Sequence, residues 1–217
     1  MSQPSTQVSR LAELQSTSRD VLYALLGSTP LATVALIRDG HPVVFPTGFA
    51  RIDHELVIHG STGSPWLRAL STGEPAAVSV TTLDAVMVAR SGFESSFRYR
   101  SAVVFGSFEL ISESDKMRYL EKLTDTFIPG RVAELRASSR KELAATVALR
   151  LAITDSNWSL KVSDGWPEDP EDDIAAGVWA GVVPMSLVYG EPERAPDCDA
   201  SIPVPGSVSG LANQRLG

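Results

Sequence analysis

Three apolar runs separated by turn residues fill residues 31–59, LATVALIRDGHPVVFPTGFARIDHELVIH. Each run has the length of a strand, and Asp39-Gly40 between the first two is a dipeptide typical of tight hairpin turns. No helix-length segment separates the runs, so we expect antiparallel pairing and not parallel pairing. This stretch therefore predicts a sheet that begins as a meander of three strands.

Short helices are expected at four places, where capping residues or apolar residues at helical spacing occur. Their ranges are 19–26, 65–70, 114–127 and 140–146. Ser64 is well placed to cap the second of them. None of the four separates the first three strands, so they favour a β architecture with short helices over a doubly wound sheet.

Further apolar runs read as strands outside the meander. They are 76–81, 85–91, 101–111 and 147–154, with 159–162 as an extension of the last one beyond a kink. Six to eight strands with short helices indicate a mainly β (α+β) fold, a barrel and not a doubly wound sheet. We expect a flexible lead-in over 1–16, one domain over 17–195 and an irregular tail over 196–217.

Composition excludes several classes of function. The net charge is −7, from 19 basic and 26 acidic residues, which argues against a nucleic-acid-binding protein. No apolar run approaches the roughly 20 residues of a membrane span. The single cysteine, Cys198, excludes an internal disulfide and suits a cytoplasmic location. His41, His54 and His59 lack metal-ligand spacing, so we expect no metal site.

The segment IHGSTGSP at 58–65 joins an expected strand to an expected helix. It contains two glycines and three hydroxyl residues. Exposed N–H groups and the positive end of a helix dipole can bind an anion there. The spacing matches neither a Walker loop nor a dinucleotide fingerprint, so an ordinary capped turn is an equally good interpretation.

A second polar segment, ARSGFESSFRYRS at 89–101, places three arginines beside aromatic residues. Guanidinium groups suit phosphate or flavin oxygens, and aromatic rings suit stacking. The alternative is that Arg98 and Arg100 only solvate a loop. Taken alone, the segment favours that alternative.

Six short motifs, in order along roughly residues 20–195, resemble one known family. They are FPT at 45–47, LVIHGS at 56–61, LRAL at 67–70, VARS at 88–91, YRSAVVFG at 99–106 and WAGVVP at 179–184. Together they are similar to the FMN-binding split-barrel proteins of the pyridoxamine 5'-phosphate oxidase-like family, in its flavin-nucleotide-binding branch.

This resemblance implies a six-stranded antiparallel split β-barrel that pairs as a homodimer, with FMN in a groove between the subunits. It also implies a set of cofactor-binding residues. The turn would hold the FMN phosphate, Pro46 and Thr47 would face the isoalloxazine, and the strand from Tyr99 would line the groove. The full set is Pro46, Thr47, His59, Gly60, Ser61, Ser64, Arg68, Arg90, Tyr99, Arg100, Ser101 and Trp179.

The sequence also departs from the oxidases of that family. Pro65 and Trp66 stand where those enzymes carry basic residues, so we expect weak FMN binding. No histidine follows His59, so the arginine and histidine pair of the oxidase substrate signature is missing and pyridoxamine phosphate is not the expected substrate.

Three hypotheses about function follow. The first is an FMN-dependent oxidoreductase of unknown small-molecule substrate; its catalytic residues are unknown, with His59 the best candidate for a proton donor. The second is a relative that holds deazaflavin or haem in the same groove, where haem would need an axial histidine. The third is a non-catalytic module that binds or senses flavin.

Overall fold

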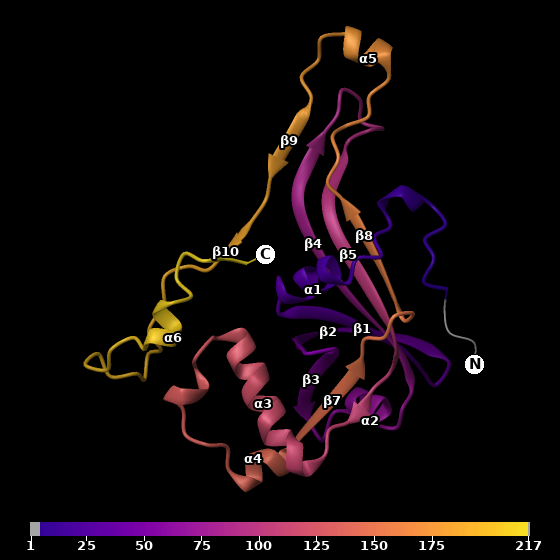
Figure 1. Cartoon of the computed structure of the whole chain (residues 1–217). Coiled ribbons are helices and arrows are strands. Elements are labelled where there is room, and N and C mark those ends of the chain that lie inside the picture. The colour runs from indigo at the N-terminus through magenta and orange to yellow at the C-terminus, as the bar shows by residue number, and fades with distance from the viewer. Residues whose placement is uncertain (1–4, 217) are drawn as a thin grey trace.

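The computed structural model describes residues 5–216, which form a curled sheet flanked by short helices (Figure 1). The strands are β1 (Leu31–Arg38), β2 (His41–Ile52), β3 (Glu55–Ser61), β4 (Pro75–Val88), β5 (Ser96–Ser107), β6 (Glu109–Leu110), β7 (Thr146–Ala152), β8 (Trp158–Ser163), β9 (Gly181–Pro184), β10 (Leu187–Val188) and β11 (Arg215–Leu216). The helices are α1 (Arg19–Gly27), α2 (Pro65–Ser71), α3 (Glu113–Phe127), α4 (Arg140–Ala145), α5 (Glu171–Ala175) and α6 (Gly206–Ser209), with 3₁₀ turns η1 (Ala12–Leu14) and η2 (Val132–Glu134). Among the residues described, no helix is long and apolar enough to cross a membrane.

The hairpin between β1 and β2 forms where the sequence predicts it. Asp39 and Gly40 have φ angles of 51° and 77°, in the left-handed region that a tight two-residue turn requires. Arg38 pairs with His41 directly across this turn. β3 then pairs antiparallel with the end of β2, so the predicted meander of three strands is confirmed.

β2 takes part in two ladders, and this opens the barrel along one side. Its residues 41–48 pair with β1, whereas residues 49–52 pair with β3. Beyond that point β3 continues along β7. The sheet runs β6-β7-β3-β2-β1-β4-β5-β8, with β9 beside β4, and every ladder is antiparallel. The expected antiparallel split barrel is confirmed, with nine strands in its sheet because short segments such as β6 and β9 add to it.

Two strand predictions are wrong. The sequence predicts separate strands over 76–81 and 85–91, but both belong to the single strand β4, whose register shifts between Leu83 and Ala85. A bulge of this kind lets a strand bend without leaving its sheet. The run 159–162 does not extend β7; it lies in β8, which pairs with β5.

Two apolar clusters stabilise the barrel. The larger cluster fills the interior, where Leu22 of α1 and Leu67 and Leu70 of α2 are fully buried against the strands. The smaller cluster lies on the other face of β2, β3 and β7, where α3 packs through Tyr119 and Leu123. Because α3 covers only part of that face, the end of β3 stays near the surface.

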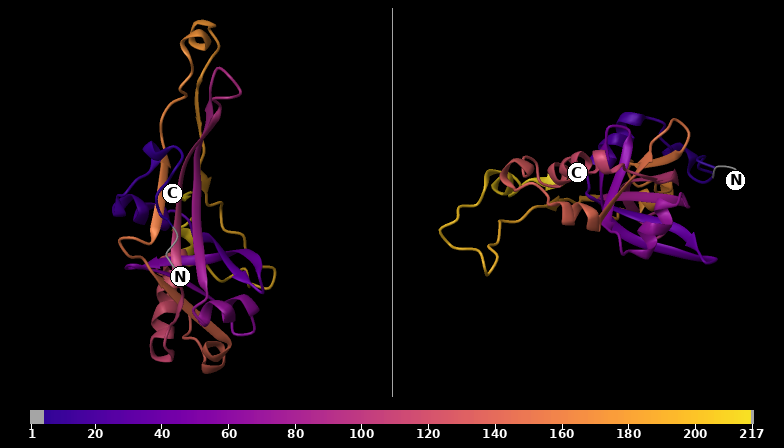
Figure 2. Two further views of the ribbon diagram at one scale, coloured as in Figure 1. Left: turned by 90° about the vertical axis from the view of Figure 1, so that its right-hand side faces the viewer. Right: turned by 90° about the horizontal axis from the view of Figure 1, so that it is seen from below.

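Two features project from the barrel. The first, which we call the arm, is the far part of the β4–β5 hairpin together with β9, which pairs with β4 over 85–88 (Figure 2, left). The second, which we call the strap, comprises residues 185–216 and includes β10, α6 and β11. The strap leaves the arm after β9 and descends on the side of α3 (Figure 1).

Candidate functional site

The turn after β3, residues 59–64, is the predicted phosphate site. Three of its N–H groups already have acceptors within the chain: Thr62 N donates to Ala145 O (3.0 Å), Gly63 N to Ser61 Oγ (3.1 Å) and Ser64 N to Ser61 O (3.0 Å). Ser64 occupies the N-cap position of α2, as predicted, but its side chain makes no capping hydrogen bond. An anion at this turn would therefore find the side-chain hydroxyls more available as donors than these backbone N–H groups.

Close packing around this turn explains two of its residues. A Cβ atom on Gly60 would lie 2.6 Å from Leu67 Cδ1, so glycine lets α2 lie directly against β3. Trp66 packs on Phe45 of β2, with ring centroids 3.7 Å apart. Trp66 thus stabilises the contact between α2 and β2 beside Pro46. The oxidases of the resembled family carry a basic residue at this position, so the turn here lacks that positive charge.

His59 faces away from the barrel interior, toward the end of α3. It borders a recess of about 350 Å³ whose other lining residues are Leu120, Leu123, Thr124, Phe127, Ile128 and Thr146. Although His59 is exposed to solvent, the surrounding atoms desolvate its ring and lower the pKa of His59 below its ordinary value. The neutral imidazole, with a free nitrogen lone pair, is therefore the favoured form in this apolar recess.

The candidate arginines differ in how they are engaged. Arg90 binds Asp169 through its Nη1 atom (2.9 Å) and its backbone N–H (2.8 Å). Arg100 forms a two-pronged ion pair with Asp84, which raises the pKa of Arg100. Within residues 5–216 Arg68 makes no ion pair, and it borders a cavity beside the turn. Arg68 thus has an uncommitted positive charge near the predicted phosphate site.

The predicted residues fall into separate regions of one chain. Pro46 and Thr47 lie on β2, near the turn, and pair with β1. Tyr99, Arg100 and Ser101 lie in the middle of β5. Arg90 lies in the loop between β4 and β5 at the far end of the arm, and the exposed Trp179 lies two residues before β9. Figure 1 shows this end of β4 and β5 well away from β3. A single chain does not bring the arm residues to the turn.

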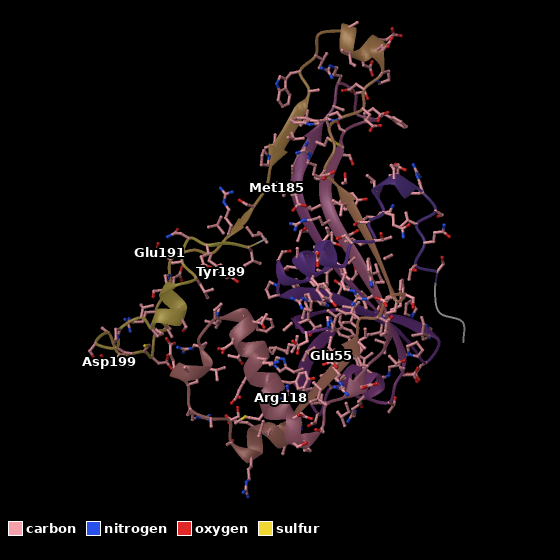
Figure 3. All side chains as sticks on the ribbon, in the orientation of Figure 1. Glu55, Arg118, Met185, Tyr189, Glu191 and Asp199 are labelled. Atoms are coloured by element: carbon pink, nitrogen blue, oxygen red, sulfur yellow. The ribbon has the colours of Figure 1, made fainter. Side chains whose placement is uncertain are left out.

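A groove under the strap was not predicted from the sequence. It consists of two cavities, of about 540 and 460 Å³, that share Arg215 and Leu216 as lining residues. We call it the strap groove. Its walls come from α1, β2, β4, the end of α3 and the strap, and Figure 3 shows Met185 and Tyr189 on the strap segment that covers it. No sequence motif marks it, because its residues come from distant segments.

Among the described residues, no cluster of three or more His, Cys, Asp or Glu side chains could hold a metal ion.

Comparison with known proteins gives a family and two similar structures. Residues 18–158 match the family model described as pyridoxamine 5'-phosphate oxidase. The structure is similar to the FAD and haem binding protein from Mycobacterium smegmatis, with 67% identity and a TM-score of 0.92, over 94% of this chain and 98% of that one. It is also similar to the flavocytochrome Anf3 from Azotobacter vinelandii, with 33% identity and a TM-score of 0.89, over 96% and 97% of the two chains. A comparison with curated proteins gives no match.

Proposed function

This chain belongs to the pyridoxamine 5'-phosphate oxidase family, and on that basis we propose that it binds a flavin nucleotide, FAD, and uses it in electron transfer. The observation that carries the proposal is the 67% identity, over 94% of the chain, to a protein named for binding FAD and haem. When bound, the flavin would supply the redox chemistry, and the protein would supply binding and orientation.

The turn after β3 favours FAD over the FMN that the sequence predicts. FMN ends in a phosphate monoester with a charge of about −1.5 to −2, which needs nearby cations. Pro65 and Trp66 provide none, and Arg68 is the one basic side chain in this short helix. In FAD each phosphate of the diphosphate carries a single charge, and the adenosine adds contacts of its own. The hydroxyls of Thr62 and Ser64, with Arg68, would hold the nearer phosphate.

We also propose that two copies of the chain pair through the outer face of β1 and β2. Leu31, Ile37 and Val44 expose 56%, 61% and 63% of their surface there. Ile37 is on β1 and Val44 on β2, and these strands are paired, so the apolar side chains form a continuous surface. A homodimer would cover it and would bring the arm of one subunit toward the barrel of its partner. In that assembly Arg90 and Trp179 would border the partner's flavin.

Haem is a second candidate ligand, and His59 is the observation that favours it. Haem iron needs an axial side chain, and a neutral imidazole is a common one. His59 borders an apolar recess formed partly by Leu123 and Phe127, and desolvation of its ring by the surrounding atoms lowers the pKa of His59 and favours its neutral form. We propose that His59 would bind the iron and that these apolar side chains would pack on the porphyrin.

The first experiment is the absorption spectrum of the purified protein, followed by chromatography of the heat-released cofactor against FAD and FMN standards. Released FAD would support the proposal, released FMN would restore the sequence-based prediction, and no retained flavin after incubation with either would refute flavin binding. Bleaching by a reduced nicotinamide would support an oxidoreductase acting on a small molecule; a flavin that stays oxidised would favour a non-catalytic flavin module.

Two variant pairs locate the ligands. Ser64→Ala should weaken flavin binding by about 1–2 kcal/mol, whereas Thr72→Ala, at the other end of the same helix with its hydroxyl bonded to Ala69 O and outside the cavity beside the turn, should not. If haem is present, His59→Gln should abolish its Soret band and His41→Gln, in the β1–β2 hairpin, should preserve it. An unchanged spectrum of His59→Gln would show that His59 does not bind the haem iron.

The cytoplasmic location also stays a proposal. Its support is the single cysteine, since such a chain forms no internal disulfide and needs no oxidising compartment. Cell fractionation with an antibody to the protein would test it.

A further inference from the structure

The strap is held to the rest of the chain at two points along its length. Near the arm, Met185 N donates to Asp84 O (2.9 Å). Near α3, Ser207 donates to Glu134 of η2 from its backbone N–H (3.1 Å) and from its hydroxyl. β11, which follows Ser207 in the chain, returns to pair with β10. The strap groove is therefore a partly open space whose strap wall is fixed in place.

The two cavities of the strap groove differ in their chemistry. The larger cavity, of about 540 Å³, is walled by the aromatic side chains Tyr23, Phe49, Phe127 and Tyr189. This volume suits a small organic molecule, and aromatic walls suit a planar ring system. Phe49 is 1% exposed and Arg51 lies over the Tyr23 ring, so Phe127 and Tyr189 are the aromatic residues most available to a ligand in the larger cavity.

The smaller cavity, of about 460 Å³, lies between β4 and the strap. Thr81 and Ser186 contribute hydroxyl residues to its lining and Asp84 a carboxylate, beside the apolar side chains of Leu83, Met185 and Leu187. The smaller cavity is therefore lined by a mixture of polar and apolar residues.

The charge of the groove is positive in a chain whose net charge is −7. Arg215 lines both cavities and forms no ion pair within residues 5–216. The one carboxylate in the lining, Asp84, is already neutralised by its two-pronged ion pair with Arg100. The uncompensated charge at the junction of the cavities is therefore that of Arg215.

We propose that the strap groove binds a planar aromatic anion, with its ring in the larger cavity and its anionic end at Arg215. Two sources have this chemistry. One is the adenosine diphosphate half of FAD, an assignment that rests on the proposed function. The other is a separate aromatic carboxylate or phosphate that acts as a substrate.

A fluorescent aromatic anion, 1-anilinonaphthalene-8-sulfonate, tests the groove directly. Arg215→Gln should weaken its binding about tenfold or more, because a contact to a charged group is worth about 1.5–3 kcal/mol. Arg140→Gln is the matched control, since Arg140 is exposed, makes no ion pair in the described structure and lines neither cavity. Equal affinities of these two variants, or no binding by the wild type, would overturn the proposal.

The two sources are distinguished by competition. If ADP displaces the probe and FAD-loaded protein excludes it, the groove holds the adenosine half of the cofactor. If FAD-loaded protein binds the probe as tightly as flavin-free protein, and Arg215→Gln still weakens it, the groove holds a separate ligand. Since the probe titration needs no flavin, failure of flavin binding and failure of the groove assignment give different results.

Discussion

Replacing Asp169 with alanine should destabilise the protein more than replacing Asp155, although the ion pair of Asp155 is the shorter one. Asp155 lies 2.6 Å from Arg19, whereas the Asp169 carboxylate lies 2.9 Å from Arg90 Nη1. The side chain of Asp155 is 100% exposed and that of Asp169 is 0% exposed. Burial, and not distance, decides which pair contributes more, because water replaces an exposed partner but not a buried one.

The magnitude for Asp169 follows from its contacts. Removing one partner of a buried ion pair costs about 3–5 kcal/mol. The side chain of Arg90 is 25% exposed, so water reaches part of its guanidinium and reduces the loss. We therefore expect Asp169→Ala to lower the free energy of unfolding of the arm by about 2–3 kcal/mol. For Asp155→Ala we expect no measurable change.

Amide hydrogen exchange measures this effect where it occurs. The Arg90 N–H donates directly to Asp169 Oδ1 (2.8 Å), so its protection should fall in Asp169→Ala and stay unchanged in Asp155→Ala. Urea denaturation of both variants shows whether the loss spreads beyond the arm. Equal protection of Arg90 in the two variants would refute the argument from burial.

Three further predictions concern the barrel. Gly60→Ala should cost about 1–3 kcal/mol in urea denaturation, because its Cβ would lie 2.6 Å from a fully buried leucine, whereas Gly63→Ala, with its nearest atom at 3.4 Å, should be nearly neutral. Asn157→Ala should cost about 2–4 kcal/mol in the same assay, since this buried side chain donates to two backbone carbonyls and accepts from one N–H. The atoms around the His59 ring desolvate it and lower the pKa of His59, so the unfolded chain binds its proton more readily and stability should rise with pH up to about 6.5. Urea midpoints of His59→Gln should lack this part of the slope, and an identical slope would contradict it.

Much of the local structure could be predicted from the sequence. Ser18 caps α1 and accepts from Val21 N (3.4 Å), and α3 occupies almost the whole range given by apolar spacing. These elements depend on interactions between residues a few positions apart, so their signals lie in adjacent sequence. The same holds for the Asp39-Gly40 turn.

The candidate site was predictable only in part. Gly60 and Ser64 stand out as a glycine and an N-cap residue at a strand-to-helix junction, a pattern that suits an anion site and an ordinary capped turn equally well. The partners of the arginines gave no such signal. Asp169 lies 79 residues from Arg90, and Asp84 lies 16 residues from Arg100, so only the paired strands and the arm bring these charges together.

The sequence by itself determined the hairpins, the helix boundaries and the antiparallel character of the sheet, because turn chemistry and side-chain alternation act over a few residues. Only the tertiary structure decided that β4 continues through a bulge, that β3 pairs with β7, and that the strap spans a groove lined by Thr82 and Arg215. These features join segments far apart in the chain. Their formation depends on the total burial and hydrogen bonding of the whole sheet, a sum that no local pattern contains.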